Sequence, residues 1–91
     1  MTTDDAMQDG LPGIDFSTLV LSLATSAMVH MGVVPETEGG PPEKNLVLAH
    51  QSIDTLEMLQ NKTRGNLSDD EAKLLQSVLY ELRMSYVKAR G

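Results

Sequence analysis

The stretch from Phe16 to Met31 contains no aspartate, glutamate, lysine or arginine, and this constrains the fold more than any other feature. Its apolar residues recur at helical spacing, with Asp15 suited to cap the start and Gly32 suited to end the helix. Projected at 100° per residue, the apolar side chains span roughly 220°, whereas a helix on a protein surface carries a stripe nearer 100° wide. The sequence therefore predicts an apolar helix over residues 14–32 that needs cover on more than one side.

The segments on either side of this helix are rich in helix-breaking residues. Residues 1–13 carry three acidic side chains and no basic one, and Gly10, Pro12 and Gly13 interrupt them. We expect a disordered acidic tail there. Residues 33–43 contain three prolines and two glycines. This composition predicts a linker rather than a phosphate-binding loop, because prolines lack the amide hydrogens that would face an anion.

Residues 44–90 carry the pattern of a helical hairpin. A helix is expected from about Glu43 to Thr63, with apolar side chains at three-four spacing. A second helix begins with the capping-box pattern Ser68 to Glu71. The apolar positions of the two helices are Leu46, Ala49, Ile53, Leu56, Leu75, Leu79, Leu82 and Tyr86. The connection around Gly65 is short, which makes the two helices antiparallel neighbours. Since strand-forming residues are sparse, we predict an all-α fold of three helices in one domain over residues 14–90.

Composition limits both the stability and the partners of the chain. It has 91 residues and no cysteine. A domain this small buries little apolar surface, and without disulfides or thiolate-bound metal the remaining help is idealised helix packing or oligomerisation. The formal net charge is −6, and every lysine and arginine lies at or after Lys44. This balance argues against binding to nucleic acid or to anionic lipid. The N-terminus lacks the basic start of a secretory signal, so we expect a cytoplasmic protein.

The first helix points to self-association. Its apolar arc is too wide for two short helices to cover, since each packed neighbour shields only a sector. We therefore predict a homo-oligomeric bundle in which copies of this helix meet, most simply as a two-fold dimer. A remaining groove can receive an amphipathic helix of another protein. The leading hypothesis is thus a protein–protein interaction or regulatory module. The residues expected at the self-association contact are Leu19, Val20, Leu23, Ala27 and Met31.

Ser22 and Ser26 lie one turn apart on the same helix. Their small side chains predict a close-packing face, at which another helix approaches closely. The alternative is a strip of hydroxyls that contacts only water. Neither serine lies in the Gly-x-Ser-x-Gly context of a hydrolase nucleophile. We predict no catalytic residue and no enzymatic activity.

His50, Asp54 and Glu57 share one face of the second helix, at i, i+4 and i+7. Such a set could bind a divalent cation if a partner chain supplied further ligands. The alternative, which we favour, is a solvated polar face opposite the apolar stripe. We expect no metal and no cofactor, and keep a small metal-binding protein as an alternative.

His30 lies on the first helix between Met28 and Met31. Thioethers and imidazole suit a soft metal such as Cu(I). Methionine at adjacent helical turns is also ordinary core filling, because its flexible thioether fits irregular gaps. We favour core packing.

A second functional hypothesis is a peripheral membrane protein that inserts its first helix. Residues 16–35 are uncharged over a length that could span a bilayer. Several hydroxyl side chains and His30 within it are disfavoured in hydrocarbon, and no lysine or arginine flanks it as an anchor. We therefore regard membrane insertion as the less favoured hypothesis.

Three blocks of sequence carry a family resemblance. They are the run from Phe16 to Gly32, the run Asp54–Leu59 followed by Lys62–Leu67, and Tyr80–Arg83 followed by Tyr86–Val87. Together they resemble the bacterial domain-of-unknown-function family 1844, over nearly all of the chain after residue 14. The resemblance implies a short, helical, bacterial protein. It brings no activity, cofactor or catalytic residue with it.

Overall fold

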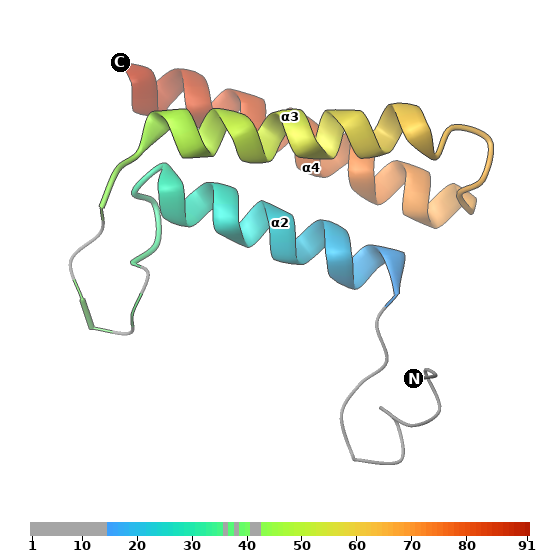
Figure 1. Cartoon of the computed structure of the whole chain (residues 1–91), viewed down its shortest axis with the longest axis horizontal. Coiled ribbons are helices and arrows are strands. Elements are labelled where there is room, and N and C mark those ends of the chain that lie inside the picture. Colours follow the sequence, from blue (N-terminus) through green and yellow to red (C-terminus); the bar gives the residue numbers. More distant parts are fainter. Residues whose placement is uncertain (1–14, 36, 38, 41–42) are drawn as a thin grey trace, which may run out of the picture.

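The computed structural model describes residues 15–35, 37, 39–40 and 43–91, and over these residues the fold is all-α. Along this part of the chain lie three helices, α2 (Phe16–His30), α3 (Leu46–Lys62) and α4 (Asp69–Arg90) (Figure 1). The predicted three-helix architecture is confirmed. The tail predicted over residues 1–13 and the linker prolines at 41–42 lie outside the described residues.

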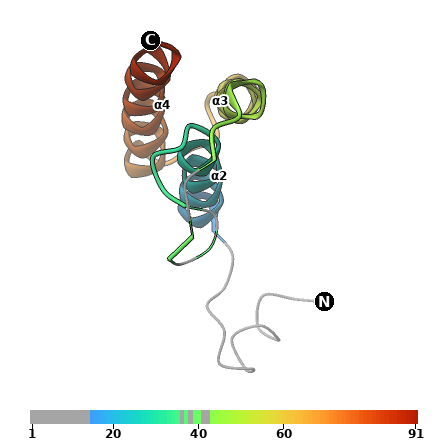
Figure 2. The same cartoon turned by 90° about the vertical axis from the view of Figure 1, so that its left-hand side faces the viewer.

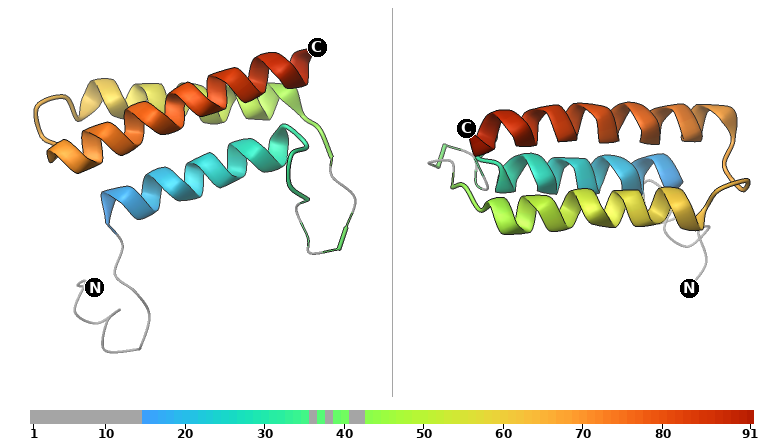
Figure 3. Two further views of the ribbon diagram at one scale, coloured as in Figure 1. Left: turned by 180° about the vertical axis from the view of Figure 1, so that it is seen from behind. Right: turned by 90° about the horizontal axis from the view of Figure 1, so that it is seen from above.

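The helices pack as a bundle with alternating directions. α3 and α4 form the predicted antiparallel hairpin, joined by the short turn between Lys62 and Asp69 (Figure 3). α2 runs antiparallel to α3, and seen end-on the three helices lie at the corners of a triangle (Figure 2). α3 and α4 therefore both lie on one side of α2, and its other side faces away from them.

One apolar stripe from each helix enters a shared core. Spacings of three and four residues turn these side chains to the same side of their helix, toward the axis of the bundle. The core residues are Val20, Ala24, Ala27, Met31, Ala49, Ile53, Leu56, Leu75, Leu79 and Leu82. All of them are apolar, and no buried polar or charged side chain occurs among the described residues.

The helix ends follow the local signals in the sequence. The Asp15 carboxylate accepts a hydrogen bond from the Thr18 amide at 2.7 Å and caps α2. Ser68 and Glu71 form the full capping box at the start of α4, each side chain bonding to the other residue's amide. Gly65 has a φ of +87°, a left-handed conformation that glycine adopts without the strain a Cβ would bring.

The start of α3 differs from the prediction, which placed it near Glu43. The helix begins at Leu46, with Asn45 as its N-cap. The Asn45 amide donates to the His30 carbonyl at 2.6 Å, and Lys44 forms an antiparallel bridge to the residue that follows α2. These contacts hold the chain extended up to the cap. Periodicity within one segment cannot reveal them, because the partners lie in another helix.

Candidate interaction surface

The side of α2 opposite the core is uncharged. The core-facing residues Val20, Ala24 and Ala27 are buried, and the opposite side of the helix looks away from α3 and α4 (Figure 2). We call this opposite side the outer face of α2. Projected at 100° per residue, it consists of Thr18, Leu19, Leu21, Ser22, Thr25, Ser26, Val29 and His30. Leu19 and Leu21 lie near the two edges of this face and are 40% and 51% exposed. α3 and α4 therefore leave part of the apolar arc of α2 uncovered.

The residues predicted at a self-association contact fall into two groups. Val20, Ala27 and Met31 lie in the core of the single chain. Leu23 is partly buried against that core, and Leu19 is exposed. The hairpin packs over the centre of the apolar arc, so its central residues are used within the chain and its edges stay accessible.

Ser22 and Ser26 are both exposed, at the middle of the outer face. A depression of about 190 Å³ lies next to them, lined by Thr25, Ser26, Val29 and His30. The Thr25 hydroxyl donates to the Leu21 carbonyl at 2.9 Å. This hydroxyl therefore already has an acceptor and loses little if the face is covered. The helical projection of the sequence already places Thr18 and Thr25 on the arc with Ser22 and Ser26, and it places Leu21 on the apolar arc, at whose edge Leu21 is exposed.

Asp15 is the charged group at the N-terminal end of the face. Hydrogen bonds from the Thr18 backbone amide and then from the Thr18 hydroxyl hold the pKa of this carboxyl below its usual 3.8. A lowered folded-state pKa means that the cap contributes stability above pH 3.8, and that this contribution is lost as the pH falls through the folded-state value.

We expect the amide resonance of Thr18 to move during an acid titration, with a midpoint below the usual carboxyl pKa of 3.8. The cause is loss of the charged acceptor that Asp15 provides. Two-dimensional NMR of labelled protein measures it. In Asp15→Asn the amide oxygen still accepts but does not titrate, so the movement should vanish. A midpoint at or above the usual value would contradict this.

The polar face of α3 is engaged in ion pairs. His50 Nδ1 lies 2.9 Å from Asp54 Oδ2, and the Glu57 carboxylate pairs with Arg83 of α4. The four side chains are roughly half exposed or more, as expected for a solvated face. The Arg83 guanidinium occupies the place beside Glu57 that a cation would need. In the part of the chain that is described, no three His, Cys, Asp or Glu side chains gather as a metal ion would require.

The methionines beside His30 contribute to packing. Met31 is 2% exposed and belongs to the core, and Met28 packs against the core from α2. The His30 carbonyl accepts the Asn45 amide. The Met31 thioether is buried among apolar side chains, and both methionines fill space in or against the core.

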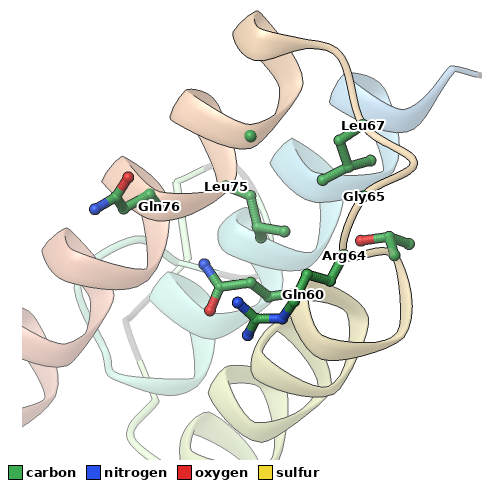
Figure 4. A pocket seen from close by; sticks show the side chains of 8 residues that line it. Gln60, Arg64, Gly65, Leu67, Leu75 and Gln76 are labelled. Carbon is green, nitrogen blue, oxygen red and sulfur yellow. The ribbon is translucent and has the colours of Figure 1, made fainter.

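A further hollow of about 370 Å³ lies beside the turn that joins α3 and α4 (Figure 4). Leu67 and Leu75 give it apolar walls, and the side chains of Gln60 and Arg64 extend along one side (Figure 4). Arg64 donates to the Asn61 amide oxygen at 3.1 Å. The side-chain amides and the guanidinium can donate hydrogen bonds to a polar group in this hollow.

No described helix has the length and apolar character required to cross a membrane.

The described chain is thus a small three-helix bundle, and its helix α2 contains no Asp, Glu, Lys or Arg. A family model described as "Domain of unknown function (DUF1844)" matches residues 13–88, most of the chain, and the chain belongs to this family. The predicted family resemblance is confirmed. Neither the curated proteins nor the solved structures provide a significant match.

Proposed function

We propose that this protein is a helical protein–protein interaction module that self-associates through the outer face of α2. The observation that carries the proposal is that α2 itself has no Asp, Glu, Lys or Arg on that face, at whose end the carboxylate is that of Asp15, the N-terminal cap. The chain has a formal net charge of −6. Two copies of an anionic protein repel least where neither presents a charge, and a two-fold contact pairs one patch with the same patch on its partner.

An antiparallel pairing centred on Ser22 fits the shape of the face. Ser22 lies near the middle of α2 (Phe16–His30). A two-fold axis there brings Leu19 of one copy to the level of Thr25 of the other, on the side that carries Ser26 and next to the depression that Ser26 lines. Leucine then fills a hollow, and the serines let the backbones approach closely. Antiparallel helices also align their dipoles favourably.

The chain suits a direct test, because it has no native cysteine. In Ser22→Cys the sole thiol would face its own copy across the two-fold axis, and a disulfide forms when the two Cα atoms lie about 4.4–6.8 Å apart. We expect mild oxidation to give a covalent dimer on a non-reducing gel.

Ser77→Cys is the matched control, since Ser77 is exposed on α4 and remote from the outer face of α2. It should remain monomeric on the same gel. The proposed pairing would be excluded if Ser22→Cys stayed monomeric, or if Ser77→Cys formed a disulfide-linked dimer as fast as Ser22→Cys.

A further inference from the structure

α4 carries a second apolar stripe that lies outside the core. Tyr80, Met84 and Val87 are 62%, 48% and 56% exposed. Their i, i+4, i+7 spacing places them on one side of the helix, and we call them the outer stripe of α4. The core-facing stripe of α4 lies roughly 140° away around the helix. The outer stripe is therefore not part of the packing that holds the bundle together.

The surface around the outer stripe is hollowed. A depression of about 420 Å³ surrounds Tyr80, lined by Gln76, Ser77, Tyr80, Glu81 and Arg83. A second one, of about 240 Å³, lies between α3 and α4 and reaches Val87 and Tyr86. Hollows beside exposed apolar side chains at helical spacing match the way an amphipathic helix docks.

The charge beside the stripe is basic toward the C-terminal end of α4, although the chain is acidic overall. From residue 73 to residue 90, α4 has four basic side chains and only Glu81 as an acid, whereas its first turn, next to Lys73, carries Asp69, Asp70 and Glu71. Facing it from α3, Asp54 pairs with His50 and Glu57 pairs with Arg83. Within the described ranges, no ion pair engages the remaining bases of this stretch, Lys73, Lys88 and Arg90.

We infer that the outer stripe of α4 is a docking site for an amphipathic helix of another protein, whose apolar anchors are flanked by acidic residues. The apolar stripe fixes the helical spacing of the anchors, and the unpaired bases select the sign of the flanking charge. No residue of this site belongs to α2, so the inference does not depend on the proposed self-association.

The probe is a synthetic amphipathic peptide with leucines at three-four spacing and glutamates between them, compared with an isomer that carries lysines instead. We expect saturable binding of the glutamate peptide by fluorescence anisotropy, weaker binding at higher salt, and no binding of the lysine peptide. Met84→Ala should weaken the glutamate peptide about tenfold, as expected for loss of an apolar anchor. Met58→Ala is the matched control, because Met58 of α3 is 47% exposed and lies outside the stripe.

Lys73→Glu provides a second variant that leaves the core untouched. It should weaken the glutamate peptide and strengthen the lysine peptide. Ser22→Glu, on the outer face of α2, should leave peptide affinity unchanged, which separates the two surfaces. The inference would be overturned if the two peptides bound equally or if Met84→Ala bound the glutamate peptide as tightly as wild type. It would also be overturned if Met84→Ala formed a particle of smaller mass than the wild-type protein. The last result would assign the stripe to a second copy.

Discussion

Replacing Leu79 with alanine is expected to lower the free energy of unfolding by about 2–5 kcal/mol. Leu79 is 1% exposed and belongs to the core that α2, α3 and α4 share. The substitution removes apolar contacts and leaves a cavity, since neighbouring side chains collapse only in part. Total stabilities of small domains are about 5–15 kcal/mol, so the loss is a large fraction. Urea denaturation followed by circular dichroism, at one fixed protein concentration, measures the change.

Val47→Ala is the control for this prediction. Val47 lies on α3 and is 79% exposed, so its truncation should change the free energy of unfolding by less than about 0.5 kcal/mol. Equal effects of Val47→Ala and Leu79→Ala would mean that Leu79 is not in a packed core.

Ser22→Glu is expected to weaken self-association at least a hundredfold while the bundle stays folded. Near the two-fold axis, each glutamate would face its copy in the other chain, and burying an unpaired charge costs several kcal/mol. About 1.4 kcal/mol corresponds to a factor of ten in affinity, so a cost of about twice that amount gives a hundredfold loss. Ser22 is exposed in the single chain, and glutamate is a better helix former than serine, so the fold itself should tolerate the change.

Ser77→Glu adds the same charge to an exposed position of α4. Sedimentation velocity at matched concentrations should show dissociation for Ser22→Glu and none for Ser77→Glu. If Ser22→Glu associates as strongly as wild type, the outer face of α2 is not the contact.

Local signals in the sequence were enough to predict the helices and most of their ends. The capping box at Ser68 and Glu71, the cap at Asp15 and the left-handed glycine at position 65 each depend on neighbours within a few residues. The antiparallel hairpin follows from the shortness of the turn. Such features can be predicted because the residues that determine them are close in sequence.

How the apolar arc of α2 is divided could not be predicted. Spacing shows that Val20, Ala27 and Leu19 all lie on this arc, but not which part the hairpin covers. The structure buries Val20 and Ala27 and leaves Leu19 exposed. That outcome depends on the angles at which α3 and α4 approach, and these depend on side chains of all three helices.

The same limit applies to the polar face of α3. Asp54 lies one turn from His50, so their contact could be expected from sequence. The partner of Glu57 is Arg83, which is 26 residues away on another helix. A sequence pattern within α3 gives no sign of this ion pair, because the partner of Glu57 lies on α4.

Static light scattering of the wild-type protein during size-exclusion chromatography tests self-association without any substitution. The chain has a mass of 9.9 kDa. At micromolar concentration we predict a particle of twice 9.9 kDa that dissociates on dilution. A folded particle of 9.9 kDa throughout the concentration range would contradict the proposal that the outer face of α2 binds a second copy.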